Sequence, residues 1–433
     1  HQGPTFLEME ECEIIGRAEI ISNKEKKKKA IQLMTRRSPI VANFNQIGAL
    51  DRLEFIRIKP FIVKYRYVPE ILQGESPTIF EFSENRSSFS SWDDIKAKAR
   101  AWKEAVRPLS LTASLVPLLL GGALAFSVLH TLNVWLFILT IVGGIMIQAG
   151  TNMINDWKDA DRDNENAEGI RPFTGGSRMI QLGLVSRADM GFFGMILSAI
   201  AAIIGFYLVA VSGWGLVPLI LYGLLAGVFY TAEKGKFSFI NLAPGLAEFL
   251  IATTFGVLMT MGAFYVQTGY FSLQAFLISL PVGVFISSVL LINQFQDAES
   301  DAKSGKKTLV VRLGKLKAKN LLIASFIVGY LIIALLPVLG YTTYNIYFAF
   351  LSVPFAVQAI RYAHQNYNKT AVDLISGNAH TAINHLFAGL LLVFAFIFNE
   401  LSIVLVALYF VASLLFVFWV WRYIERRRKT MNS

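Results

Sequence analysis

The chain has 433 residues, of which 54% are hydrophobic and only 16% are charged. This composition excludes an ordinary soluble globular protein and indicates that most of the chain lies in a membrane. The formal net charge is +10 at pH 7, and basic loops on one side of a membrane account for it, so we expect no nucleic-acid partner. The single cysteine, Cys12, excludes an internal disulfide framework.

The first 90 residues precede any apolar run of membrane-spanning length. Residues 12–21 and 52–68 alternate as short strands do, around a lysine-rich helix near 24–29. The pattern predicts a small α+β cytoplasmic domain over 1–90, and it weakly resembles flavin-binding split-barrel proteins without a flavin contact that can be matched. An accessory domain without chemistry is the simpler interpretation.

Residues 91–106 form the joint between this domain and the membrane. Trp92, Ile95, Ala99 and Trp102 recur at helical spacing, with lysines and arginines between them. We therefore expect an amphipathic helix in the headgroup plane. A solvated linker helix is the alternative.

Apolar runs long enough to cross a bilayer fill the rest of the chain. A spanning helix needs about 20 apolar residues. The runs that reach this length lie near 108–128, 133–155, 189–212, 214–231, 243–265, 272–294, 319–340, 343–362, 380–398 and 401–422. Because several joints are short, the count can change by one, and our prediction is nine to ten spans with ten as the best estimate.

Lys and Arg lie on one side of these predicted spans. The joints without Lys or Arg are 130–133, 212–214, 265–272 and 340–345, whereas the alternate joints and the tail after 422 are rich in both. Cytoplasmic loops are enriched in Lys and Arg. We therefore expect an integral protein of the cell membrane, with both termini and the basic loops in the cytoplasm.

Two of the predicted spans end in clusters of carboxylates. The second span leads into NMINDWKDADRD and the sixth into NQFQDAESD. On continuing helices each cluster shares one face: Asn152, Asp156, Asp159 and Asp163 in the first, and Asn293, Asp297 and Asp301 in the second. Clustered carboxylates at a helix C-terminus are stable mainly when a cation neutralises them. Ligand sets made only of oxygen favour a hard cation such as Mg²⁺.

Magnesium held by few carboxylates completes its coordination with water and phosphate oxygens. This indicates a phosphorylated substrate, and a diphosphate at the membrane edge with a long apolar tail is most simply a prenyl diphosphate. Basic residues that could bind its oxygens are Arg178, Lys234, Lys236, Lys306, Lys307 and Arg312. The second and sixth spans look like equivalent members of two halves, so their acidic ends could face each other across a cavity.

These residues resemble the motifs of the UbiA superfamily of intramembrane prenyltransferases. NDWKDADRD fits the superfamily's NDxxDxxxD motif through Asn155, Asp156, Asp159 and Asp163, and Asp297 with Asp301 fits its second motif, DxxxD. The segments GKKTLVVRLG, FTGGSRMIQLGLVS and RPLSLTASLVPLLLG are most like those of 1,4-dihydroxy-2-naphthoate polyprenyltransferases, which act in menaquinone synthesis.

The resemblance implies an all-α polytopic bundle of about nine to ten transmembrane helices around a central cavity, covering 107–400. The remaining residues, 401–433, would be an added transmembrane helix with a basic tail. It also implies two Mg²⁺ ions bridging the donor diphosphate, held by Asp156, Asp159, Asp163, Asp297 and Asp301 with help from Asn152, Asn155 and Asn293. Glu248 could orient a hydroxyl of the aromatic acceptor, or make only a structural hydrogen bond.

Other functions remain open on the sequence alone. YTAEKGK at 230–236 differs from the loop expected in the naphthoate subgroup, so the acceptor could be a hydroxybenzoate, a homogentisate, a haem or chlorin, or a glycerol phosphate ether. A cation transporter should place its carboxylates at the bilayer midplane, whereas these lie at span ends. An inactive scaffold is less compatible with the intact carboxylate set. The sequence identifies no protein partner.

Overall fold

The computed structural model describes residues 10–21, 23–37, 55–67, 78–81, 92–165, 176–181, 184–231, 239–303 and 305–431. Two compact units make up the chain. The first comprises 1–102, 159–167 and 178–187, and the second comprises 103–158, 168–177 and 188–433.

The first unit contains a three-stranded antiparallel sheet in the order β1-β2-β3. The elements are β1 (Glu10–Ile20), α1 (Lys24–Arg37), β2 (Ile56–Tyr67) and β3 (Thr78–Glu81). The register pairs Glu10 with Tyr67 and Ile20 with Ile56, and it shifts between Ile15 and Gly16. The strands predicted at 12–21 and 52–68 and the intervening helix are therefore present.

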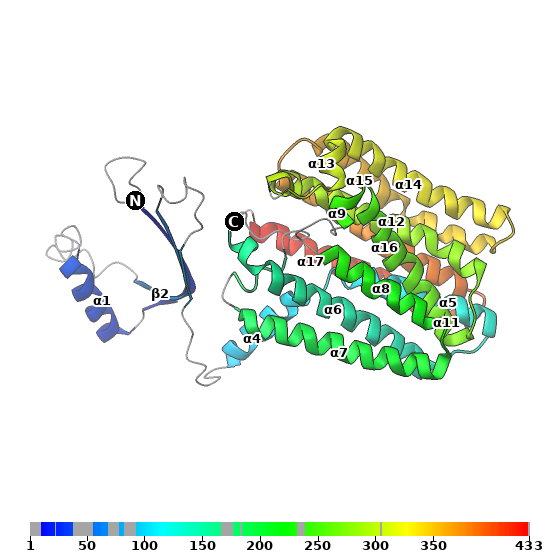
Figure 1. Ribbon diagram of the computed structural model, residues 1–433, viewed down its shortest axis with the longest axis horizontal. Coiled ribbons are helices and arrows are strands. Elements are labelled where there is room, and N and C mark those ends of the chain that lie inside the picture. Colours follow the sequence, from blue (N-terminus) through cyan, green and yellow to red (C-terminus); the bar gives the residue numbers. More distant parts are fainter. Residues whose placement is uncertain are drawn as a thin grey trace. The chain divides into compact units, whose positions relative to one another are not determined.

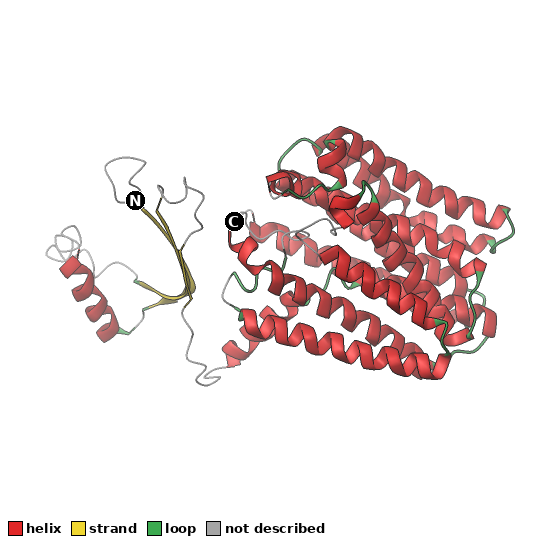
Figure 2. Cartoon of the chain, in the orientation of Figure 1, coloured by secondary structure: helices red, strands yellow, loops and turns green. Residues whose placement is uncertain are grey.

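The second unit is helical, as Figures 1 and 2 show. Its helices, with α4 leading into them, are α4 (Trp92–Ala105), α5 (Thr112–Leu129), α6 (Val134–Glu165), α7 (Arg187–Ser212), α8 (Leu216–Thr231), α9 (Phe239–Leu242), α10 (Leu246–Ala252), η3 (Thr253–Leu258), α11 (Met259–Thr268), α12 (Leu273–Lys303), α13 (Leu309–Leu313), α14 (Lys315–Val338), η4 (Tyr344–Ser352), α15 (Val353–Asn366), α16 (Ala371–Ile397) and α17 (Ile403–Met431).

Among the described residues, nine helices are long and apolar enough to cross a membrane. The segment predicted at 214–231 is a shorter apolar helix, α8, in which Leu216–Gly227 is the apolar part. The last predicted segment is one of the nine, over Ile403–Arg426. Among these residues the number of spans is therefore within the predicted nine to ten, and it is one below the best estimate because α8 is short.

Two of the spans depart from a regular α-helix. The span from Leu246 to Thr268 contains the π-helical turn η3, and the span beginning at Tyr344 starts as the 3₁₀-helix η4. In η3, a Cβ added at Gly256 would lie 2.3 Å from the Gly283 Cα of α12. Only glycines allow these two backbones to approach so closely.

Helix α16 lies at the centre of the bundle. It packs against α5, α12, α15, η4 and α17, and 94% of its apolar window is buried. Small and branched apolar residues make this fit, since Ile383, Ala388 and Leu392 are all fully buried.

Helix α17 contacts the last turn of α4. The Tyr423 hydroxyl lies 2.8 Å from both carboxylate oxygens of Glu104. The Lys103 ammonium lies 5.5 Å from the centre of the Tyr423 ring and 5.8 Å from that of Trp419. Helix α17 is thus joined to the segment that leads into the first span.

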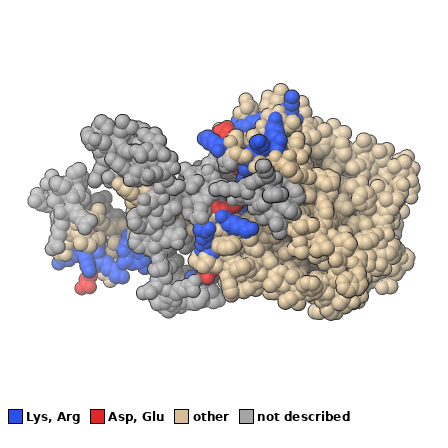
Figure 3. Space-filling model, viewed as in Figure 1, with Lys and Arg blue, Asp and Glu red and all other residues tan. Residues whose placement is uncertain are grey.

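Charge is unevenly distributed over the second unit. On the face that Figure 3 shows, Lys and Arg gather at one end, and most of the remaining surface carries neither. A wide uncharged band with charge at its margin is the surface that a bilayer requires.

Candidate active site

Both acidic clusters lie on helices that continue beyond their apolar segments. α6 runs unbroken to Glu165 and α12 to Lys303, as predicted for a shared carboxylate face. In Figure 1 the two helices run through the same bundle. The carboxylates therefore lie at span ends rather than in span centres, which disfavours the transporter interpretation.

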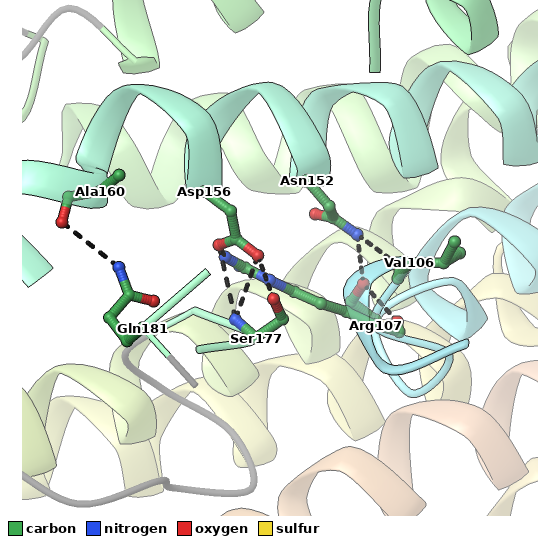
Figure 4. A network of polar contacts seen from close by, with 8 residues as sticks. Val106, Arg107, Asn152, Asp156, Ala160, Ser177 and Gln181 are labelled. Atoms are coloured by element: carbon green, nitrogen blue, oxygen red, sulfur yellow. Dashed lines mark hydrogen bonds and ion pairs between the residues drawn. The ribbon is translucent and has the colours of Figure 1, made fainter. Parts of the chain in front are cut away.

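A row of polar side chains on α6 holds the turn between α4 and α5. Gln148, Asn152 and Asp156 are spaced four residues apart and so lie on one face. The Gln148 amide donates to the Ser110 carbonyl at 2.6 Å. The Asn152 amide donates to the Val106 carbonyl at 3.2 Å and to the Ser110 hydroxyl at 2.8 Å (Figure 4). The Val106 carbonyl follows the C-terminal end of α4, where a helix leaves carbonyls unpaired, so Asn152 satisfies one of these acceptors.

Asp156 is the most heavily bonded of these side chains. Its side chain is only 6% exposed and forms an ion pair with the Arg107 guanidinium. The Ser177 hydroxyl and backbone N–H both donate to it, the N–H at 3.2 Å from Oδ2 (Figure 4). A buried carboxylate is stable when paired and hydrogen-bonded in this way.

The backbone around these donors adopts conformations uncommon for side-chain-bearing residues. Arg107 has φ +57° and Arg178 has φ +61°, while Gly176, just before Ser177, has φ +76°. Non-glycine residues in the left-handed region cluster at functional sites. Arg107 and Ser177 thus present donors to Asp156 from tightly turned backbone.

In the second cluster, Asn293 is bonded to a neutral amide. The Asn378 amide of α16 donates to the Asn293 side-chain oxygen at 2.6 Å. Beside it, the Gln294 amide donates to the buried carboxylate of Glu248, and the Gln294 oxygen accepts the Val310 backbone N–H at 3.3 Å. Glu248, a predicted acceptor-binding residue, therefore lies next to the second cluster in contact with α12.

The basic residues after α12 form a compact turn. The backbone N–H of Lys307 donates to the Asn241 side chain at 2.8 Å. The Arg312 guanidinium donates to the carbonyls of Asn241 and Lys307 at 2.7 and 2.8 Å. Arg312 thus stabilises this turn, while the Lys307 side chain is exposed and Lys306 is half-buried.

The remaining predicted residues are placed as follows. Asn155, Asp159, Asp297 and Asp301 are half-buried on α6 or α12. Arg178 is buried in the first unit. Asp163 belongs to α6, but its side chain lies outside the described residues, as do Lys234 and Lys236.

The candidate ligands in these two clusters are side-chain oxygens of Asp and Asn, which suit a hard cation. No group of three or more His, Cys, Asp or Glu side chains within the described part of the chain is arranged to hold a metal. Asp156 is already compensated by Arg107. The donor chemistry fits Mg²⁺, and a cation at Asp156 would replace Arg107 as the partner of that carboxylate.

A match to a protein-family model shows the family to which the chain belongs. The model of the UbiA prenyltransferase family matches residues 114–376. The chain belongs to this family. It is therefore an integral membrane prenyltransferase, and the predicted resemblance is confirmed.

Two relatives of this UbiA family member are named as transferases of naphthoate or naphthoquinone compounds. The 1,4-dihydroxy-2-naphthoate octaprenyltransferase of Bacillus subtilis is 31% identical over 300 residues, covering 67% of this chain and 89% of that protein. The 2-carboxy-1,4-naphthoquinone phytyltransferase of Synechocystis is 27% identical over 301 residues, covering 68% and 92%. An apo structure of a UbiA homologue from Aeropyrum pernix has a TM-score of 0.50 at 16% identity, covering 67% and 98%, and supports the fold.

Several residues of the site were missed by sequence reasoning. Arg107 and Ser177 lie within RPLSL and GGSR, which carried the family resemblance without an assigned role. Asn378 and Gln294 gave no signal of their own, because an amide in an apolar segment does not reveal its partner. The recurrence of a polar residue at every fourth position of α6 is the signal that predicts Gln148 on the same face as Asn152 and Asp156.

Proposed function

We propose that this UbiA family enzyme transfers a polyprenyl chain from a prenyl diphosphate to 1,4-dihydroxy-2-naphthoate, with release of carbon dioxide, in menaquinone synthesis. The observation that carries the proposal is the pair of acidic motifs on α6 and α12 in a chain 31% identical to a naphthoate octaprenyltransferase. The Synechocystis relative bears the name of a naphthoquinone phytyltransferase, which supports a naphthalene ring as acceptor but leaves tail length open.

The carboxylates of the two clusters would hold Mg²⁺ together with the donor diphosphate. The proposed ligands are Asp156, Asp159, Asp163, Asp297 and Asp301, with Asn152, Asn155 and Asn293 beside them. Magnesium bound there would supply positive charge to the departing diphosphate.

The chain's own basic residues would share that task. We assign diphosphate contacts to Arg178, Lys234, Lys236, Lys306, Lys307 and Arg312. As the carbon–oxygen bond of the donor breaks, the allylic carbon becomes electrophilic and is attacked by the electron-rich acceptor ring. Glu248, held by Gln294, would orient an acceptor hydroxyl beside that carbon.

The apolar bundle would protect the reactive carbon from water. Helix α16 is almost entirely buried at its centre, and the charged residues visible in Figure 3 are confined to one end of the second unit. A dry site prevents hydrolysis of an allylic cation. By the distribution of Lys and Arg, that end and both termini would face the cytoplasm of the cell membrane.

The proposed domain organisation adds peripheral parts to this enzyme core. Residues 1–90 would form a cytoplasmic accessory domain and 91–106 an interfacial helix. Residues 107–400 would form the prenyltransferase domain, with 401–433 as an added helix and tail.

Prenyl transfer by the purified chain in lipid tests the proposal. The assay contains Mg²⁺, a labelled prenyl diphosphate and a panel of acceptors that includes 1,4-dihydroxy-2-naphthoate, a hydroxybenzoate and homogentisate. We expect a Mg²⁺-dependent prenylated naphthoquinol. Transfer only to another acceptor would refute the naphthoate assignment, and no diphosphate release with any acceptor would refute the catalytic proposal.

A further inference from the structure

The ion pair between Arg107 and Asp156 joins a partly accessible cation to an inaccessible anion. The Arg107 side chain is 30% exposed and the Asp156 side chain only 6%. Asp156 belongs to the cluster proposed to bind Mg²⁺, yet its charge is compensated here by a guanidinium. A cation that binds Asp156 must therefore compete with Arg107 for the same carboxylate.

The chain fixes Arg107 where it can make this pair. Its backbone lies in the left-handed region at φ +57°. The Arg107 carbonyl accepts the Ser110 N–H at 3.0 Å and the Ser110 hydroxyl at 2.9 Å, and Asn152 of α6 holds the preceding Val106 carbonyl. The guanidinium therefore starts from a backbone anchored to α6 and reaches Asp156 without a change of fold.

Arg107 also has unused hydrogen-bonding capacity. A guanidinium carries five N–H donors, and Asp156 is its only hydrogen-bonded side-chain partner in the described structure. Its Nε–H is buried and has no partner among the described residues. A buried donor without an acceptor is costly, and a phosphate oxygen is an acceptor that suits the planar fork of arginine.

We propose that Arg107 exchanges Asp156 for the diphosphate of the prenyl donor, so that tight cation binding at Asp156 requires the donor. Without donor, the guanidinium compensates the buried carboxylate. With donor, the guanidinium binds phosphate oxygens and a divalent cation takes its place at Asp156. Every buried charge keeps a partner in both states, which is the condition for a buried pair to open. This inference rests on the proposed function.

The proposal makes cation and donor binding mutually dependent. If the donor raises the affinity for the cation, the cation raises the affinity for the donor by the same factor. A typical coupling of this kind changes affinity about 10-fold.

Binding of Mn²⁺ to the full chain in lipid nanodiscs, followed by electron paramagnetic resonance, tests the exchange without turnover. Titrations are made with and without a non-hydrolysable prenyl diphosphonate. For the wild type we expect weak binding alone and binding about 10-fold tighter with the diphosphonate. For Arg107→Gln we expect tighter binding than wild type in the absence of diphosphonate, and little further gain when it is added.

Lys158→Gln is the matched control. Lys158 lies two positions after Asp156 on α6, and its side chain is exposed. Like Arg107→Gln, the substitution removes one positive charge close to Asp156 in the sequence or in space, but it does not touch the ion pair. We expect its Mn²⁺ titrations to match those of the wild type in both conditions.

Arg107→Lys is a second variant that keeps the charge. Its ammonium can still compensate Asp156 but cannot bind phosphate through a planar fork. We expect weak Mn²⁺ binding alone and a smaller gain with diphosphonate than in the wild type. This variant carries the test if Arg107→Gln does not fold.

Distinct results would overturn the exchange and the proposed function. Without diphosphonate, Mn²⁺ binding by folded Arg107→Gln that is no tighter than wild type would refute the exchange, as would unchanged coupling in Arg107→Lys. In both cases, diphosphonate-dependent Mn²⁺ binding by the wild type would leave the proposed function standing. Absence of Mn²⁺ binding by the wild type in both conditions would refute the metal site and the exchange together.

Discussion

Asn152 and Asn293 occupy matching places in the two acidic clusters, each four residues before an aspartate of the motif. Their hydrogen bonds have opposite sense. The Asn152 amide nitrogen donates to the Val106 carbonyl and the Ser110 hydroxyl, whereas the Asn293 oxygen accepts from the Asn378 amide. Equal spacing in the sequence thus predicts the position of each asparagine on its helix. The neighbouring residues determine whether its side-chain nitrogen donates or its side-chain oxygen accepts.

The same contrast extends to the charges. In the first cluster a cationic side chain compensates Asp156, while in the second the nearby Glu248 is bonded to the neutral amide of Gln294. The α6 cluster therefore depends on an ion pair and on the backbone of the α4–α5 turn. Around the α12 cluster, the Asn378 amide of α16 bonds Asn293, and the Lys315 ammonium lies 3.6 Å from the Glu299 carboxylate.

Loss of an aspartate from either acidic cluster should have the largest effect on prenyl transfer. Asp156→Asn and Asp297→Asn should each reduce prenyl transfer below detection, because each removes a charged oxygen from the proposed cation site. Transfer is measured with the folded variants in lipid, and folding is checked by thermal unfolding. Retention of transfer by both variants would contradict the assignment of the clusters as the site.

Gly256→Ala should have the next largest effect, through the position of α12. The added Cβ would lie 2.3 Å from the Gly283 Cα, so the two backbones must separate, at a cost of about 1–3 kcal/mol for overpacking. We expect a lower unfolding temperature and weaker transfer. Gly223→Ala is the control, because a Cβ at Gly223 meets nothing within 4 Å, and equal losses in both would contradict this explanation.

Replacing each asparagine by aspartate tests the difference between Asn152 and Asn293 directly. Asn152→Asp removes the N–H donors that hold Val106 and Ser110, so the free energy of unfolding should fall by about 1–3 kcal/mol. Asn293→Asp keeps an oxygen that accepts from Asn378, and its stability should change less. Chemical unfolding of both variants in detergent measures the difference. A larger loss in Asn293→Asp would show that the contrast between the clusters is wrong.

Glu248→Gln should have the smallest effect and should act on the acceptor. The change keeps the size of the side chain but removes its charge, so we expect the KM for the acceptor to rise about 10-fold, which corresponds to about 1.4 kcal/mol, the size of one hydrogen bond. The KM for the prenyl donor should stay unchanged. Steady-state kinetics with each substrate varied in turn distinguishes the two. A change confined to the KM for the prenyl donor would contradict the acceptor assignment and indicate that Glu248 contacts the diphosphate.

The sequence predicted what depends on local pattern. Long apolar runs located the spans, and the spacing from Asn152 to Asp163 anticipated a helix that continues past its apolar part. Partners were not predictable, since the contact of Arg107 with Asp156 joins residues on different elements. The left-handed backbone of Arg107 gave no signal either, because it is held by tertiary bonds and not by a glycine.

The contact between α4 and α17 links the beginning of the bundle to its end. Tyr423 holds Glu104, and Glu104 lies three residues before Arg107, whose N–H donates to the Glu104 carbonyl at 3.0 Å. A ribosome makes residue 104 long before residue 423. The surroundings of Arg107 are therefore complete only after the last span has been synthesised and inserted, so a nascent chain that already carries both acidic motifs still lacks part of the support of the first.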